Sequence, residues 1–150
     1  MKLLARILEK LLGKRYGDDA PELDMYLPNP ALSIAMVFTG FGIVLAAAAF
    51  LTANLMFLIG TVIGIPLGIS AFLCWKNQSI RMITSGKFEY TTMFGNKHIY
   101  QFSDITGLRK NKDSLTLMVA GKKVHIEAMA VLSQRLVNAI NQALQENKKR

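Results

Sequence analysis

The longest feature in the pattern of hydrophobic and polar positions is an apolar stretch over residues 31–75 that contains no Asp, Glu, Lys, Arg or His. A bilayer core about 30 Å thick is crossed by roughly 20 apolar residues of α-helix. The stretch is about twice that length, and polar Thr52 and Asn54 interrupt it near its middle. We therefore predict a two-helix transmembrane hairpin, with helices at about 31–51 and 54–75.

Both apolar segments lack the polar face of a helix on a soluble protein, which makes a soluble helix pair the less favoured alternative. In the second segment glycines recur at every fourth residue, at Gly60, Gly64 and Gly68. Lipid gives helices no hydrophobic reason to associate, so small residues that allow close backbone approach mark a packing face. We assign this glycine stripe to packing between the two helices of one chain, with packing between chains as the alternative.

The pattern changes to alternation of apolar and polar residues after residue 76, which predicts short strands joined by tight turns. The Gly95-Asn96 pair is a hairpin signal, with glycine in a position that needs positive φ. A helical apolar stripe over 129–145 predicts one C-terminal amphipathic helix that closes the core. Residues 76–150 are therefore predicted to form an α+β cytoplasmic domain with an antiparallel meander. Its six predicted strands are residues 78–84, 87–94, 97–102, 105–110, 114–119 and 122–126.

Charge is distributed unevenly along the chain. Residues 1–15 show leucines at helical spacing opposite lysines, which predicts an amphipathic helix of charge +4. Such a helix suits an anionic lipid surface, and docking on the protein's own domain or on a partner is the alternative. Residues 16–30 form an acidic linker of charge −4, so the formal net charge of +8 belongs to residues 76–150.

The Lys and Arg residues also predict the orientation of the hairpin. Five precede the first span, none lies in the connecting turn and thirteen follow the second span, which accounts for all 18. Cationic flanks remain on the cytoplasmic side of a membrane. We therefore expect a multi-pass protein of the plasma or inner membrane, embedded in the lipid bilayer, with both termini in the cytoplasm.

Two short motifs resemble a known family. Tyr100-Gln101-Phe102-Ser103-Asp104-Ile105-Thr106-Gly107 and Phe94-Gly95-Asn96-Lys97, together with the hairpin and the C-terminal helix, are similar to the bacterial pleckstrin-homology-like (PH-like) membrane proteins. The resemblance covers residues 31–150. It implies a partly open antiparallel β-barrel of two orthogonal sheets, capped at one end by the C-terminal helix. It implies little about activity.

The chain departs from the wider PH fold in two respects. Phosphoinositide-binding members place basic residues in the first strand–strand loop, whereas the corresponding loop here, Thr84–Lys87, is short and has a single cation. Specific inositol-phosphate recognition is therefore not expected. The fold also has seven strands where the alternation predicts six, and Leu23–Leu27 is the candidate for the missing strand.

Residues capable of catalysis or metal binding occur singly. Cys74 has no second cysteine to pair with, and His98 and His125 lie on separate predicted strands without acidic or thiol partners at metal-ligand spacing. Asp104 precedes Ile105 in a predicted turn, where aspartate commonly bonds the backbone. We predict that the protein is not an enzyme and uses no cofactor or metal.

The basic residues of the domain are the remaining candidates for a binding site. They fall in two groups, which the meander could bring together as a lipid- or partner-binding patch: Arg109, Lys110 and Lys112, and Lys122 and Lys123. The alternatives are a solvated surface that serves only membrane topology, and contact with anionic lipid headgroups. Nucleic acid is not expected, because aromatic residues are not interleaved with the lysines.

These patterns favour a non-enzymatic, membrane-anchored PH-like module that binds a protein or peptide, or self-associates, at the cytoplasmic face. Two alternatives of other kinds remain open. One is an oligomeric membrane-active protein, holin- or channel-like, assembled through the glycine stripe. The other is a domain that binds anionic lipid headgroups through its basic residues.

Overall fold

The structure, a computed structural model, describes residues 22–111 and 114–149. The predicted amphipathic helix 1–15, most of the acidic linker and Lys112 lie outside the described residues. Among the described residues the chain forms two compact units. One is residues 29–76, and the other combines residues 22–28 with residues 77–149.

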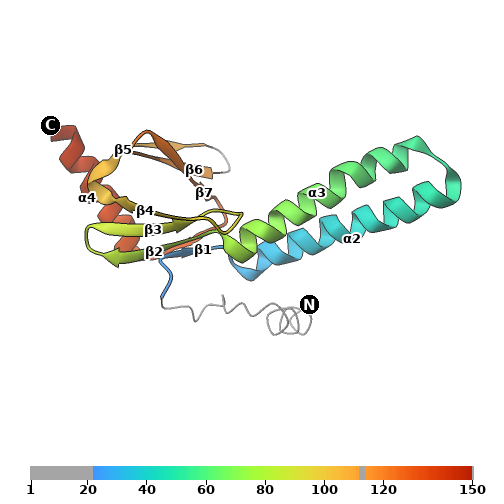
Figure 1. Cartoon of the computed structure of the whole chain (residues 1–150), viewed down its shortest axis with the longest axis horizontal. Coiled ribbons are helices and arrows are strands. Elements are labelled where there is room, and N and C mark those ends of the chain that lie inside the picture. The colour runs from blue at the N-terminus through green and yellow to red at the C-terminus, as the bar shows by residue number, and fades with distance from the viewer. Residues whose placement is uncertain (1–21, 112–113, 150) are drawn as a thin grey trace. The chain divides into compact units, whose positions relative to one another are not determined.

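The first unit consists of two long apolar helices, α2 (Asn29–Thr52) and α3 (Leu55–Asn77), drawn in Figure 1. Their mean hydropathies of 2.4 and 2.2 and their lengths of 24 and 23 residues are sufficient to cross a membrane. The turn between them contains Ala53 at a φ of +51°. The side-chain oxygen of Asn54 then accepts a hydrogen bond from the Met56 amide at 2.9 Å, which caps α3.

The glycine stripe of α3 faces α2. A Cβ added to Gly64 would lie 3.3 Å from the Cα of Gly42, and one added to Gly68 would lie 2.6 Å from the backbone nitrogen of Thr39. A Cβ on Gly60 would meet a side-chain carbon of Leu45 at 2.5 Å. The two helices therefore approach each other closely along this stripe, as small residues permit.

The second unit consists of strands and one helix, as the alternating pattern predicted. All of its strand pairings are antiparallel. After the first sheet, a short 3₁₀ segment, η1 (Phe102–Asp104), leads into the second. The strands are β1 (Met25–Tyr26), β2 (Ser79–Thr84), β3 (Lys87–Thr91), β4 (Lys97–Gln101), β5 (Ile105–Lys110), β6 (Ser114–Val119), β7 (Lys122–Glu127) and β8 (Val131–Leu132), followed by helix α4 (Gln134–Lys149).

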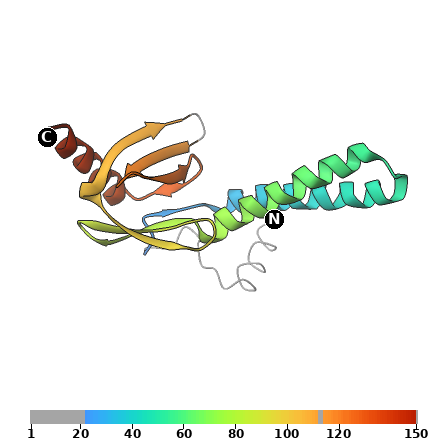
Figure 2. The same cartoon turned by 45° about the horizontal axis from the view of Figure 1, so that its top comes forward.

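Two sheets share one core in this unit, and Figures 1 and 2 show α4 beside both of them. The five-stranded sheet has the order β4-β3-β2-β1-β8, and the three-stranded sheet has the order β5-β6-β7. Ile80 and Phe88 from the first sheet, Leu117 and Val124 from the second, and Leu136 from α4 are all buried in the common core. The helix thus closes the space between the sheets.

The strand β1 precedes the helical hairpin in the chain but belongs to the strand-rich unit. Met25 pairs with Ile80 of β2 on one side and with Leu132 of β8 on the other. The prediction that residues 23–27 supply an additional strand is therefore confirmed for Met25–Tyr26, which is the extent of β1. The hairpin is an insertion between two neighbouring strands of the same sheet.

The predicted start of the C-terminal helix and the predicted end of one strand differ from the structure by several residues. The C-terminal helix begins at Gln134 rather than at residue 129, because Val131 and Leu132 join β1 as a strand. Ser133 then caps the helix, accepting a hydrogen bond from the Leu136 amide at 3.2 Å. The strand predicted over 87–94 ends at Thr91, because a turn over 92–96 replaces its last residues.

Candidate functional site

The strand register separates the two groups of basic residues that the sequence suggested as one patch. Arg109 pairs with Thr116 near the start of β6, whereas Lys122 pairs with Val119 at its other end. Lys110 lies beyond Arg109, and Lys123 is next to Lys122, all four being exposed. The two groups therefore lie at opposite ends of β6. The β6–β7 turn reverses the chain before Lys122, so the register does not bring these four residues together, and Lys112, the fifth residue of the predicted patch, lies outside the described residues.

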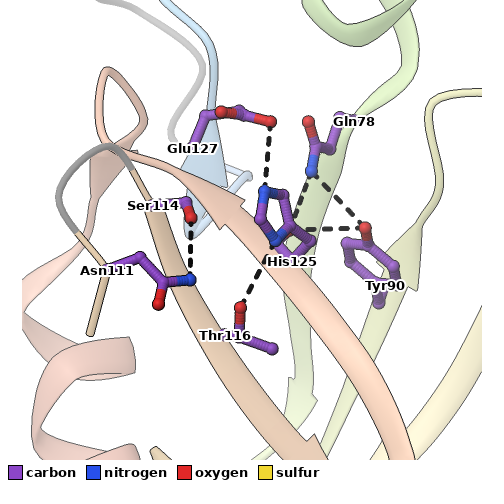
Figure 3. Close-up of polar contacts among 7 residues, drawn as sticks. All are labelled: Gln78, Tyr90, Asn111, Ser114, Thr116, His125 and Glu127. Carbon is purple, nitrogen blue, oxygen red and sulfur yellow. Dashed lines mark hydrogen bonds and ion pairs between the residues drawn. The ribbon is translucent and has the colours of Figure 1, made fainter. Parts of the chain in front are cut away.

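The two histidines lie in different sheets. His98 is exposed on β4, and its ring centroid is 6.1 Å from that of Tyr100. His125 lies on β7, where its Nδ1 is 3.4 Å from the Thr116 hydroxyl and its Nε2 is 3.5 Å from a Glu127 carboxylate oxygen (Figure 3). These distances are too long for strong hydrogen bonds. Among the described residues, no group of three or more His, Cys, Asp or Glu could hold a metal ion.

The backbone of His125 joins the two sheets. Its carbonyl oxygen accepts hydrogen bonds from the side-chain amide of Gln78 at 2.7 Å and from the Tyr90 hydroxyl at 3.3 Å (Figure 3). Tyr90 lies on β3 of the five-stranded sheet, and Gln78 directly precedes β2 of the same sheet. Both side chains are buried. Buried polar groups of this kind fix the geometry of a core when they are bonded. This cluster holds β7 against the segment that follows α3.

The remaining single candidates have local partners. Asp104 lies in η1, where its carboxylate is 3.5 Å from the Ser103 hydroxyl and its backbone carbonyl accepts a hydrogen bond from the Ala120 amide at 2.9 Å. Cys74 is half-buried in α3.

A polar cluster forms around Asp24, which sequence patterns placed in the acidic linker. Its side chain is fully buried and accepts hydrogen bonds from the Met82 amide at 2.7 Å and from the Ser133 hydroxyl at 2.7 Å. Arg135 donates to both carboxylate oxygens, through Nε and, at 2.8 Å, through Nη2. The backbone of Asp24 also bonds Ile80 and Ser133. The cluster joins the segment before the hairpin to β2 and to the start of α4.

Burial by itself raises the pKa of the Asp24 carboxyl. The hydrogen bonds from Arg135, Met82 and Ser133, together with the charge of Arg135, outweigh that effect and leave the pKa below its usual value of 3.8. The hydrogen bond from Arg135 to Asp24, and the charge of Asp24, raise the pKa of Arg135. Because the guanidinium is 57% exposed, this is a buried anion held by a partly solvated cation. Such an arrangement is typical of a structural tie rather than a reactive site.

A groove lies between β5 and the C-terminal half of α4. It has a volume of about 460 Å³ and is lined by Thr106, Gly107, Leu108, Leu144 and Asn147. The Asn147 amide donates to the backbone carbonyl of Ile105, which fixes this part of α4 against the strand. Leu108 is 42% exposed. The volume of the groove lies within the range of ligand-binding pockets, and its lining offers both apolar and polar contacts.

Comparison with protein-family models, with curated proteins and with solved structures gave no match. The assignment of function therefore depends on the residues described above.

Sequence patterns missed the Asp24 cluster and the groove for different reasons. Asp24 is the last acidic residue before the apolar stretch and lies within the largely apolar segment Leu23–Leu27. An acid in such a context is a signal for a buried, hydrogen-bonded carboxylate. The groove had no comparable signal, because its lining comes from two elements about forty residues apart.

Proposed function

We propose that this protein is a non-enzymatic, membrane-anchored module of PH-like architecture, which binds a protein or peptide partner at the cytoplasmic face. The groove beside the edge strand β5 is the observation on which the binding function depends. The membrane anchor and the PH-like architecture each draw on separate observations.

The exposure of the hairpin supports the membrane anchor. Only 11% of the residues in the most apolar window of each helix are buried. Phe50 is 90% exposed, Leu51 is 81% exposed and Met56 is 73% exposed. Apolar surface on this scale is unfavourable in water and favourable in hydrocarbon, and the α-helix is a conformation whose backbone hydrogen bonds are made within the segment, as a membrane span requires.

The order of the elements supports the PH-like architecture. Strands β1 to β4 form one sheet, β5 to β7 form a second, and α4 closes the core between them. Strand β1 supplies the seventh strand that the alternation lacked, and β8 adds a two-residue edge strand. The PH-like arrangement of seven strands and one helix thus has a counterpart for each element.

The edge position of β5 supports binding of an extended peptide. In the three-stranded sheet β5 pairs with β6 alone. An edge strand has unpaired backbone groups that an added strand can bond, and side-chain pockets then provide specificity. Leu108 and Leu144 would contact an apolar side chain of the peptide, while Thr106 and Asn147 supply polar contacts.

A photo-crosslinker at Leu108 tests the groove in the full-length chain in its native membranes. We expect p-benzoylphenylalanine at this position to give a discrete adduct with another polypeptide, identified by mass spectrometry. Ile83 is the matched control, because it is an apolar strand residue of similar exposure, 49% against 42%, on the other sheet. No adduct from Leu108, or the same adducts from both positions, would contradict a groove-specific partner.

The oligomeric alternative loses part of its basis in the structure. The glycine stripe that would join hairpins faces α2 of the same chain, so its close contacts are made within the hairpin. The headgroup-binding alternative is also weaker, because the two basic groups lie at opposite ends of β6.

A further inference from the structure

One row of paired residues crosses the five-stranded sheet at the edge where the chain enters and leaves the hairpin. Lys97, Thr91, Ser79, Tyr26 and Val131 lie side by side, one from each strand. Five adjacent strands about 4.8 Å apart make this hairpin-side row roughly 19 Å wide.

The chain connections keep this row close to the ends of the hairpin. Tyr26 is three residues from the start of α2, and Ser79 is two residues from the end of α3. At 3.8 Å between consecutive Cα atoms, these connections reach at most about 11 Å and 8 Å. If the hairpin spans a bilayer, the row lies within that distance of the helix ends that leave the membrane.

A turn at one end of the row presents an exposed phenylalanine. Within residues 92–96, the Thr92 amide donates to the Asn96 carbonyl and the Gly95 amide to the Thr92 carbonyl, each at 2.9 Å. Gly95 has a φ of +83°, which favours glycine. Phe94 is 70% exposed, the highest value among the large apolar side chains of the described strand-rich unit. A hydrogen-bonded turn therefore presents an exposed aromatic ring.

A contact within the strand-rich unit places this turn beside Asn77. The side-chain amide of Asn77, the last residue of α3, donates to the Met93 carbonyl at 2.7 Å. At the opposite end of the row, Val131 and the nearby Met129 are 42% and 43% exposed. Exposed apolar side chains thus flank both sides of the point where β1 and β2 connect to the hairpin.

We infer that this end of the domain lies in the bilayer interface, with Phe94 inserted at the boundary between headgroups and acyl chains. On the other flank, Met129 and Val131 contact the same membrane surface. The inference rests on the proposed membrane anchor. Exposed aromatic and apolar side chains favour this depth of a membrane. The cation of the row, Lys97, pairs with Glu89 at 3.0 Å, so the contact depends on apolar side chains more than on charge.

Fluorescent labels on the full-length chain in vesicles of phosphatidylcholine with a minority of phosphatidylglycerol test the inference. Single cysteines replace Phe94, Ile83 or Phe50 in a Cys74→Ser background, and each is labelled with the environment-sensitive dye NBD. Ile83 is the matched control, since it is an exposed apolar residue near the opposite end of β2. Phe50 reports insertion of the hairpin itself.

We expect lipid-borne nitroxide to quench the label at residue 94 at least about twofold more than the label at residue 83, and iodide in the water to show the reverse order. The difference should persist in vesicles of phosphatidylcholine alone. Equal quenching at residues 94 and 83, with strong nitroxide quenching at residue 50, would overturn the inference and leave the membrane anchor intact. If the dye at residue 94 reports an apolar environment but lipid-borne nitroxide does not quench it, the surface contacts protein rather than lipid. That result would also overturn the inference. Absence of nitroxide quenching at residue 50 would refute the anchor instead.

Discussion

Asp24 shows how one buried side chain connects distant parts of the chain. We expect Asp24→Asn to lower the free energy of unfolding of the domain by about 1–3 kcal/mol at neutral pH, because the amide cannot accept the full set of hydrogen bonds. The pKa of Asp24 is depressed in the folded protein, so its stabilisation is fully present above about pH 3.8 and is lost as the pH falls through the lower, folded-state pKa. Thermal unfolding of the full-length protein in detergent, followed by circular dichroism across the acid range, measures both effects.

The control for this prediction is Asp104→Asn, which makes the same chemical change at a carboxylate with one long contact of 3.5 Å. That variant should unfold close to the wild type at neutral pH. If the dependence of stability on acid pH disappears in Asp24→Asn but not in Asp104→Asn, that dependence arises from the Asp24 cluster. Equal unfolding temperatures for Asp24→Asn and the wild type at neutral pH would show that the cluster contributes little.

At the scale of elements, the packing of α2 against α3 depends on where each glycine lies. Gly68→Ala would place a Cβ 2.6 Å from the Thr39 nitrogen, so we expect it to destabilise the helix pair by about 1–3 kcal/mol. Gly40→Ala is the matched control, because nothing lies within 4 Å of its added Cβ. Unfolding in mixed micelles with increasing dodecyl sulfate, followed by the fluorescence of the single tryptophan, Trp75, would compare them. Equal effects of the two substitutions would contradict close packing at Gly68.

The elements with strong periodicity could be predicted from sequence, and those fixed by distant contacts could not. The apolar stretch predicts two helices, and alternation predicts the strands over 105–110 and 114–119 with the bounds that the structure has. The two-residue strand β8 is too short to show a period, and it becomes a strand because Leu132 pairs with Met25. The helix pattern therefore placed the start of α4 too early. The basic residues could be identified from the sequence, but the distance between them depends on the register of β5 and β7 with β6.

At the scale of the whole molecule, the hairpin interrupts a domain rather than preceding it. Residues 22–28 belong to the strand-rich unit although the hairpin separates them from its other residues. The Asp24 cluster and the pairing of β1 with β2 join the chain on both sides of the hairpin. A domain assembled in this way requires both ends of the hairpin on the same side of a membrane.

That requirement predicts the accessibility of two positions in intact cells. In a Cys74→Ser background, we expect a cysteine at Ala53, in the turn between α2 and α3, to react with a membrane-impermeant maleimide added outside. A cysteine at Lys122, exposed at the β6–β7 turn, should react only after the membrane is permeabilised. The excess of Lys and Arg on both flanks of the hairpin gives the direction, because cationic flanks remain in the cytoplasm. Labelling of residue 122 in intact cells would contradict this topology. Labelling of neither position before permeabilisation would argue that the hairpin does not reach the outer surface.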